Sequence, residues 1–226
     1  MSQQQSQNNQ MEYGKRGLFV SFEGNDGSGK TTQIQRLTAW LQSHGREVLL
    51  LREPGGTRIG EKIREMLLDK AHHEMAAVTE MLLYAASRAQ LVHTVIRPAV
   101  EAGSIVICDR FVDSSYAYQG FGRQLGLQTV RNANAPAIGD LMPHRTYFLD
   151  LDADLSMARR QASGLETDRL ENEAMAFHRR AYEGYLELCA LEPERICRVP
   201  VMDGDTQRTP EDVAAQIQKD LLPLLT

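Results

Sequence analysis

The feature that most constrains this chain is a glycine-rich segment between an apolar run and an amphipathic run. Residues 24–31 read GNDGSGKT, which fits the pattern GxxxxGK[ST] without a mismatch. The run LFVSFE precedes the segment as a candidate strand, and a candidate helix follows over residues 30–44. Glycines let such a loop bend around phosphate groups, and the helix N-terminus adds a favourable partial positive charge. Strand, loop and helix in this order predict a binding site for a nucleoside triphosphate.

The residues of this loop form the predicted ATP-binding set. Lys30 is expected to reach the β- and γ-phosphates from an otherwise solvent-facing position, and the hydroxyl of Thr31 is expected to bind Mg²⁺. The alternative for the whole segment is a glycine-rich turn without a ligand, and the alternative for Asp26 alone is a solvated turn residue. The predicted ATP-binding residues are Gly24, Asn25, Asp26, Gly27, Ser28, Gly29, Lys30, Thr31 and Thr32.

The rest of the chain alternates short apolar runs with longer amphipathic runs, which is typical of an α/β fold with a mostly parallel sheet and helices on both faces. The candidate strands are residues 18–23, 47–51, 104–108, 145–151 and 195–199. Each is almost continuously apolar, so we expect each strand to be buried on both faces. The remaining candidate helices are residues 58–68, 76–102 with a bend near Pro98, 114–118, 127–133, 155–161, 171–191 and 211–222. Residues 161–168 are expected to form a mobile connection.

Composition narrows the classes of function. The 226 residues, 42% hydrophobic and 24% charged, are typical of a soluble globular protein with one α/β domain or two small ones. The net charge of −5 argues against a nucleic-acid polymer as partner. Cys108, Cys189 and Cys197 form no CxxC pair, which argues against a disulfide framework or a zinc site and favours the reducing cytoplasm.

Two further features concern membranes and the N-terminus. The chain has no apolar stretch long enough to span a membrane, so no membrane partner is expected. Residues 1–16 are rich in Gln, Asn and Ser and contain no apolar run, which excludes a secretory signal in this segment. We expect residues 1–16 to form a disordered tail.

Two charged segments follow candidate strands and are expected at the carboxyl edge of the sheet, where ligands bind in open α/β folds. The segment REPGGT begins at Arg52, whose guanidinium can clamp a phosphate. Asp109 ends another strand and can hold Mg²⁺ directly or through water, while the neighbouring Arg110 can contact phosphate. The alternatives are a charged turn for the first segment and an ordinary strand-end salt bridge for the second.

Three further groups of residues are candidates for substrate contacts. Tyr84 and Arg88 are four residues apart in a candidate helix and therefore share one face. Core packing is the alternative for this pair and for the second group, which consists of Phe111, Ser114, Ser115, Tyr116, Tyr118 and Gln119. The third group flanks Gly164, and its alternatives are a solvated face and a lid that closes on phosphate. This group consists of Arg159, Arg160 and Arg169.

Together these segments resemble the thymidylate kinase family. The matching stretches are FEGNDGSGKTTQ, REPGGT, EMLLYAASRAQ, DRFVDSSYAYQG and DRLE, which span most of the chain in the order of the family. The resemblance implies a P-loop kinase fold with a five-stranded parallel sheet, a single domain over residues 17–226 with a small lid around residues 159–171, and a homodimer. It also implies transfer of the γ-phosphoryl group of ATP to dTMP, giving dTDP and ADP with Mg²⁺, in dTTP biosynthesis.

The resemblance assigns roles to individual residues. Asp26 would bind the sugar 3′-hydroxyl, and Arg52 and Arg110 would hold the acceptor phosphate. Tyr84 would stack on thymine at a position where the family usually has Phe, and Arg88 would donate to a thymine carbonyl. Tyr118 would crowd the 2′ position and favour deoxyribose. The substrate-binding set is Asp26, Arg52, Glu53, Pro54, Tyr84, Arg88, Arg110, Ser114, Ser115, Tyr118 and Gln119.

The source of the catalytic cation is left open by the resemblance. One branch of the family carries an Arg after the acidic residue of the P-loop, where this chain has Gly27. Members without that Arg carry the cation in the lid, typically directly before the lid glycine, where this chain has Ser163. We favour Arg169, which belongs to the DRLE segment. The full set of predicted catalytic residues is Asp26, Lys30, Arg110, Arg159, Arg160 and Arg169, and the predicted metal ligands are Thr31 and Asp109.

Two other functions are weighed against this one. A nucleotide switch of the GTPase type would carry an NKxD-type motif that reads guanine, and the chain has none. Such a switch would also have no use for a second phosphate site at Arg52. Within the kinases, the acceptor could be another nucleoside monophosphate such as dUMP or dCMP.

Overall fold

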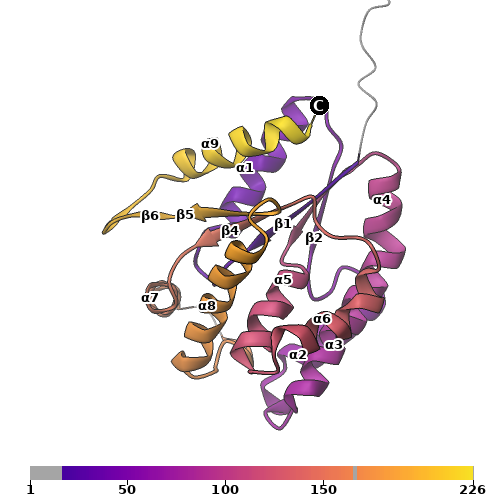
Figure 1. Ribbon diagram of the computed structural model, residues 1–226. Coiled ribbons are helices and arrows are strands. Elements are labelled where there is room, and N and C mark those ends of the chain that lie inside the picture. The colour runs from indigo at the N-terminus through magenta and orange to yellow at the C-terminus, as the bar shows by residue number, and fades with distance from the viewer. Residues whose placement is uncertain (1–16, 165–166, 226) are drawn as a thin grey trace, which may run out of the picture.

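A computed structural model describes residues 17–164 and 167–225, and the tail expected at residues 1–16 lies outside them. Five strands form one parallel sheet, as predicted, and their order in the sheet is β2-β3-β1-β4-β5 (Figure 1). The glycine-rich segment follows the central strand of this sheet. The strands are β1 (Leu18–Glu23), β2 (Val48–Arg52), β3 (Ile105–Asp109), β4 (Arg145–Asp150) and β5 (Ile196–Pro200).

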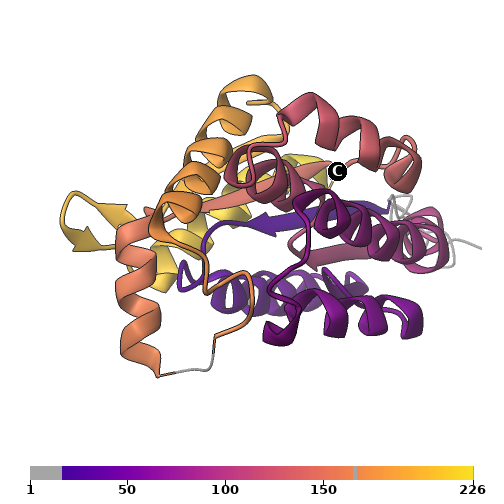
Figure 2. The ribbon, with the colours of Figure 1, turned by 90° about the horizontal axis from the view of Figure 1, so that it is seen from below.

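Helices cover both faces of the sheet. Alternate residues of each strand point to opposite faces, where they pack with the helices into two separate apolar clusters. Val20, Ile107 and Leu149 pack with α1 (Lys30–Ser43) and α9 (Pro210–Leu221). Their strand neighbours pack on the opposite face with α3, α6 and α8, so that α1 and α8 lie on opposite sides of β1 (Figure 2). The other helices are α2 (Arg58–Leu68), α3 (Ala77–Leu91), α4 (Arg97–Glu101), α5 (Val112–Ser115), α6 (Leu127–Ile138), α7 (Ala153–Ser163) and α8 (Met175–Leu191).

The two edge strands differ from the prediction that every strand is buried on both faces. Every residue of β1 is buried, whereas β2 has no buried residue and β5 has exposed positions at Arg198 and Pro200. An edge strand pairs on one side only, and the covering helices extend less fully over it. The apolar sequence of β2 therefore led to a prediction of more burial than the strand has.

The helix predicted over residues 76–102 is interrupted. It consists of α3, a π-helical turn η2 (Val92–Ile96) and α4, with Pro98 in the first turn of α4. A proline ring clashes with the carbonyl group four residues earlier in a regular α-helix. The wider turn directly before α4 removes that constraint, so the irregularity lies before Pro98 rather than at it.

Other boundaries differ from the predicted ones through local hydrogen bonding. The helix expected at residues 114–118 is α5 followed by a π-helical segment η3 (Tyr116–Gly122). The last long helix begins at Met175 rather than at residue 171. Elements without a counterpart in the prediction are the 3₁₀ turns η1 (Lys70–His72) and η4 (Leu222–Leu224), and the hairpin of β6 (Met202–Asp203) and β7 (Thr206–Gln207).

Candidate active site

The glycine-rich segment between β1 and α1 forms a tight loop whose shape depends on its glycines. Gly24, Gly27 and Gly29 have φ angles of 129°, 75° and 93°, which L side chains rarely adopt. At Gly24 a Cβ atom would also lie 2.6 Å from a backbone carbonyl oxygen of β4. The amide Nδ2 of Asn25 donates to the carbonyl oxygen of Leu151 at 3.0 Å, which fixes the loop to the end of β4. A loop of this shape at the N-terminus of α1 can bind phosphate through backbone N–H groups.

Lys30 is buried against this loop, which corrects the expectation that it faces solvent. Its Nζ donates to the carbonyl oxygens of Gly24 and Asn25 at 3.0 and 3.1 Å and lies 3.7 Å from Oδ1 of Asp26. Only 7% of Lys30 is exposed. An ammonium group has three donors, and these oxygens take the places that phosphate oxygens would fill. Lys30 must therefore exchange loop oxygens for phosphate oxygens when a nucleotide binds.

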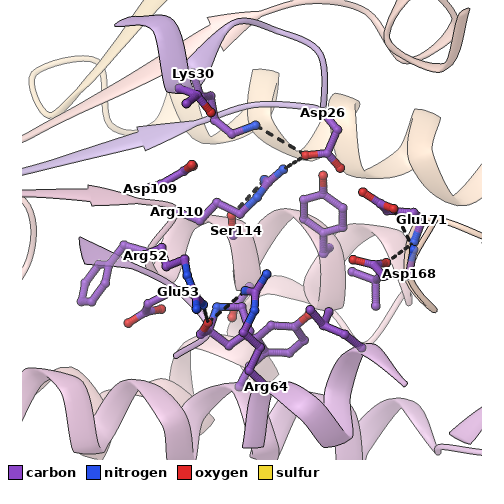
Figure 3. A pocket seen from close by; sticks show the side chains of 18 of the residues that line it. Asp26, Lys30, Arg52, Glu53, Arg64, Asp109, Arg110, Ser114, Asp168 and Glu171 are labelled. Carbon is purple, nitrogen blue, oxygen red and sulfur yellow. Dashed lines mark hydrogen bonds and ion pairs between the residues drawn. The ribbon is translucent and has the colours of Figure 1, made fainter. Parts of the chain in front are cut away.

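The loop opens into a cavity of about 460 Å³ that brings most of the predicted site residues together. A cavity of this size suits a small-molecule ligand. The REPGGT loop, α2, α3, the end of β3, η3 and the segment before α8 supply its other walls (Figure 3). The predicted residues that line it are Asp26, Gly27, Gly29, Lys30, Thr31, Thr32, Arg52, Glu53, Pro54, Tyr84, Arg88, Asp109, Arg110, Ser114, Ser115, Tyr118 and Gln119.

Arg110 and Asp26 form a charged pair in this cavity. Nη2 of Arg110 donates to Oδ1 of Asp26 at 2.6 Å, and its Nη1 lies 3.4 Å from Oγ of Ser114 (Figure 3). Arg110 has a φ angle of 67°, and a non-glycine residue in this region costs about 1–3 kcal/mol. Desolvation alone would raise the pKa of Asp26, but the charges of Arg110 and Lys30 outweigh it and hold the pKa below its usual range. The Asp26 carboxylate therefore stays ionised near neutral pH.

Arg52 is held at the cavity by the loop that follows β2. Its Nη1 donates to the carbonyl oxygen of Pro54 at 3.1 Å, and its Nη2 donates to Oε2 of Glu61 at 2.9 Å. Oε1 of the same carboxylate accepts from the backbone N–H of Gly56 at 2.7 Å, and the Glu53–Pro54 peptide bond is cis. About half of the Arg52 side chain, 48%, is exposed. The guanidinium can therefore meet an anionic ligand without leaving the loop that orients it.

Tyr84 and Arg88 lie on one face of α3 and both line the cavity, as their spacing predicts. Arg88 is only 1% exposed, and its Nε and Nη2 both lie within 2.8 Å of Oε2 of Glu53. Its other contacts are with Oγ of Ser115, Oδ1 of Asn134 and the carbonyl oxygen of Phe111. A guanidinium has five N–H donors, so each donor of Arg88 has a protein acceptor within reach. A contact between Arg88 and a base requires one of these bonds to open.

Two buried carboxylates support the cavity wall. Oε1 of Glu53 has no hydrogen-bond partner among the described residues, and burial raises the pKa of Glu53 to about 7 against the opposing effect of Arg88. Glu23, at the end of β1, accepts from the backbone N–H of Phe111 at 2.7 Å and from the hydroxyl groups of Ser114 and Tyr185. Burial, together with a neighbouring carboxylate, raises the pKa of Glu23 to about 7 as well.

Arg169, the residue favoured from the sequence as the lid cation, lines neither of the two described cavities. Its Nε donates to the carbonyl oxygen of Leu67 at 2.8 Å, and its Nη2 donates to Oε2 of Glu80 at 2.7 Å. Glu80 is fully buried on α3, and a buried carboxylate needs a paired cation. The two residues are 89 positions apart, so the sequence around Arg169 carries no sign of this partner.

Arg159 occupies the space beside Gly27. A Cβ atom at Gly27 would lie 3.4 Å from Cβ of Arg159, and Nη1 of Arg159 donates to the carbonyl oxygen of Gly27 at 3.1 Å. Its Nη2 donates to Oε1 of Gln207 in the β6–β7 hairpin at 3.1 Å. The missing side chain at residue 27 therefore lets α7 pack directly on the P-loop.

The side chain of Arg160 lies on the same side of α7 as Asp26. The two residues line a second, small cavity together with Tyr118 and His178. Nη2 of Arg160 donates to Oε2 of Glu171 at 2.6 Å, and the positive charge of Arg160 contributes to the lowered pKa of Asp26. Among the three predicted lid arginines, Arg160 is the one that shares a described cavity with Asp26.

Comparisons with known proteins place this site in a family. A family model described as thymidylate kinase matches residues 22–217. The chain belongs to the thymidylate kinase family. Thymidylate kinase from Thermoanaerobacter sp. is 46% identical over 91% of this chain and 100% of the relative, and that from Lactobacillus delbrueckii is 50% identical over 89% and 94%. The crystal structure of thymidylate kinase from Ehrlichia chaffeensis matches with a TM-score of 0.71 and 29% identity, over 91% of this chain and 98% of that one.

The resemblance to thymidylate kinases did not indicate every residue of the cavity wall. Arg64 and Leu68 lie four residues apart on α2, so their shared face was a usable signal. The others sit in or near the turn before α8, where Asp168 and Glu171 exchange hydrogen bonds between backbone N–H groups and carboxylates, each 2.8 Å long. The sequence of such a turn has no helical periodicity of apolar residues, so a pattern search does not find it. The missed residues are Arg64, Leu68, Asp168, Leu170, Glu171 and His178.

The site offers a place for Mg²⁺, the ion that kinases of this kind use with ATP. Oδ1 of Asp109 is buried and has no hydrogen-bond partner in the part of the chain that the structure describes, and Thr31 lines the same cavity. No cluster of three or more His, Cys, Asp or Glu within residues 17–164 and 167–225 could hold a metal alone. Mg²⁺ takes one or two carboxylates and completes its shell with water and substrate phosphates, so this sparse set fits it.

Proposed function

We propose that the protein transfers the γ-phosphoryl group of ATP to dTMP, giving dTDP and ADP. The observation that carries the proposal is that the P-loop opens into the same cavity as a second basic region. Arg52 and Arg110 line this cavity from the ends of β2 and β3, and Arg110 is paired with Asp26 of the P-loop. A protein that only binds or hydrolyses ATP has no use for this second region, whereas a kinase needs it for the acceptor phosphate.

Each charged group then has a task in the transfer. Lys30 leaves the carbonyl oxygens of the loop and binds the β- and γ-phosphates. Arg52 and Arg110 hold the acceptor phosphate, whose oxygen is already anionic and needs no general base. Asp26, ionised and paired with Arg110, orients that guanidinium and accepts from the sugar 3′-hydroxyl. Thr31 and Asp109 would hold Mg²⁺, which neutralises charge on the phosphates when bound.

The base and sugar would occupy the opposite part of the cavity. Tyr84 offers its ring to the base, and Tyr118 lines the cavity beside Arg110, whose guanidinium carbon lies 5.5 Å from the centre of the Tyr118 ring. This packing limits the freedom of the Tyr118 ring. A fixed ring near the sugar is what selection against a 2′-hydroxyl requires.

We assign the cation that stabilises the transferring group to Arg160. It already lies beside Asp26, whereas Arg159 binds the outer face of the P-loop and Arg169 is paired with Glu80. Arg160 must exchange its Glu171 partner for the phosphoryl group during the reaction. A cation delivered in this way is worth roughly 10³–10⁵ in rate.

The experiment that tests the proposal is ADP production with ATP and Mg²⁺ over a panel of acceptors. We expect dTMP and dUMP to be phosphorylated well above dCMP, and ADP release without acceptor to be slight. Equal ADP release with and without dTMP would overturn the proposal in favour of an ATPase or a switch. A preference for dCMP would replace dTMP by another nucleoside monophosphate.

We also propose that the chain acts as a homodimer in the cytoplasm. Val78 and Leu82 are exposed one turn apart on α3, and Ile59 and Met66 are exposed two turns apart on the adjacent α2. Apolar side chains in such rows favour a partner surface. The three cysteines are free thiols, which fits a reducing compartment. Sedimentation equilibrium should give the mass of two chains for the native protein and of one chain for Leu82→Glu. A monomeric native protein at micromolar concentration would refute the dimer.

No helix in the described part of the chain is long and apolar enough to cross a membrane.

A further inference from the structure

One buried carboxylate, Glu80, lies behind the part of the cavity wall assigned to the base. It is on α3, one turn before Tyr84, and it is fully buried and does not line the cavity. Its Oε1 accepts from Nε2 of Gln119 at 2.8 Å and from Nε of Arg123 at 3.2 Å. Its Oε2 accepts from Nη2 of Arg123 and from Nη2 of Arg169, at 2.8 and 2.7 Å. Four donors from three residues therefore converge on this carboxylate.

The charge state of Glu80 determines which way the Gln119 amide points. Burial would raise the pKa of Glu80, but the hydrogen bonds and the charge of Arg123, with the bonds from Gln119 and Arg169, hold it below its ordinary value. An ionised carboxylate only accepts hydrogen bonds. The atom of Gln119 that faces Glu80 must therefore be the NH₂ group, and the amide cannot turn over without placing its oxygen against a carboxylate.

Gln119 is itself part of the cavity wall. Ser115 and Tyr118, which precede it in the sequence, line the same cavity. Because one N–H of Nε2 binds Glu80, Oε1 is the acceptor that the amide can offer to a ligand. The N3 position of thymine and uracil carries a hydrogen and donates, whereas N3 of cytosine is an acceptor. An amide fixed with its oxygen toward the base would attract the first and repel the second.

We propose that Glu80 is a positioning residue for base choice, which holds the Gln119 amide so that Oε1 meets the N3–H of a thymine or uracil base. The inference rests on the proposed function, since it presumes a pyrimidine nucleotide in the cavity. It gains weight from Arg88, the other candidate for reading the base, because each donor of Arg88 already has a protein acceptor. Arg123 and Arg169 hold Glu80 in place in turn. Arg169 and Gln119 therefore bind the same buried carboxylate.

The test compares the affinities of the full-length protein for dTMP and 5-methyl-dCMP by isothermal titration calorimetry. These two ligands differ only at N3 and C4 of the base. We expect Glu80→Gln to lower the preference for dTMP over 5-methyl-dCMP by at least about tenfold, because a neutral amide at residue 80 lets Gln119 turn over. A purely structural role would weaken both ligands equally and leave the ratio unchanged, and that result would overturn the inference.

Four further variants make the result specific. Gln119→Leu should lower the same ratio, and adding Glu80→Gln to it should change the ratio no further, whereas independent effects of the two substitutions would contradict the coupling. Asp113→Asn is the matched control, because it breaks another buried ion pair, with Arg195, that does not contact Gln119. This variant should leave the ratio unchanged.

If Glu80→Gln does not fold, Glu80→Asp replaces it, because it keeps the charge but withdraws the carboxylate from Gln119. An unchanged ratio in Glu80→Asp would equally overturn the inference. Absence of dTMP binding by the native protein would instead sink the proposed function.

Discussion

The phosphate-binding loop and the acceptor side of the cavity are built in opposite ways. The loop consists of consecutive residues, depends on three glycines with positive φ angles and offers mainly backbone groups. The acceptor side consists of side chains that come from residues as far apart as Arg52 and His178. These side chains are held by ion pairs, such as those of Arg110 with Asp26 and of Arg88 with Glu53. The loop is therefore sensitive to backbone shape, whereas the acceptor side is sensitive to the loss of single charges.

The largest effect should come from the one side chain of the loop that must move. Lys30→Met keeps the apolar stem and removes the ammonium group, and we expect kcat to fall by roughly 10³-fold. Affinity for dTMP, measured by calorimetry, should stay within about threefold, because the acceptor residues are untouched. Turnover within tenfold of the native value would show that the loop does not rely on this cation.

The second prediction separates support from catalysis on the acceptor side. Arg169→Ala leaves the buried Glu80 with one cation fewer, and we expect a loss of about 3 kcal/mol in the free energy of unfolding, measured with urea. The single-turnover rate should fall by less than about tenfold, since Arg169 does not reach the cavity. Arg179→Ala, which removes the exposed pair with Asp154, is the control and should change stability far less. A hundredfold slower transfer with unchanged stability would restore Arg169 as the lid cation.

The third prediction compares two neighbours on α7. Arg160→Ala should lower the single-turnover rate at saturating ATP and dTMP by about a hundredfold, because it removes a cation beside Asp26. Arg159→Ala should lower it by less than about tenfold, since its contact is with a backbone carbonyl oxygen of the P-loop. The reverse order of effects would move the cation to Arg159. Near-normal rates for both variants would leave Arg110 as the stabilising charge.

The fourth prediction uses pH. The pKa of Glu53 is raised by burial from 4.5 to about 7, so the folded protein binds this proton more tightly than the unfolded chain does. The stability gained from that proton is complete below pH 4.5 and is lost as the pH rises through 7, up to about 3 kcal/mol. Urea unfolding should therefore show that Glu53→Gln gains stability relative to the native protein between pH 5 and pH 8. A constant difference over this range would show that Glu53 stays ionised throughout.

The contrast between the two regions also explains what could be predicted from the sequence. The P-loop, the sheet and the facing of Tyr84 and Arg88 follow from local patterns, so their prediction succeeded. The partners of Arg169 and Lys30 did not follow, because Glu80 is 89 positions from Arg169 and because the carbonyl oxygens that hold Lys30 leave no mark in the side-chain pattern. A residue in a motif was recognisable, but its partner in the folded chain was not.

The same limit applies to the residues that line the cavity without belonging to a motif. Asp168 and Glu171 form a turn whose hydrogen bonds are reciprocal, and they line the cavity together with Asp26 (Figure 3). The predicted helix began at residue 171, whereas α8 begins at Met175, so the sequence pattern placed Glu171 in a helix rather than in this turn. Arg160 is held beside Asp26 by Glu171, a partner that its spacing from Gly164 does not indicate.

The most direct test of the central claim is to follow the γ-phosphoryl group itself. ATP labelled in the γ-phosphate is incubated with the protein, Mg²⁺ and dTMP, and the products are separated. The account predicts that the label appears in dTDP in a one-to-one ratio with ADP, and that both products depend on dTMP. Label released as inorganic phosphate at the same rate with and without dTMP would contradict the account, because the second basic region would then not receive an acceptor.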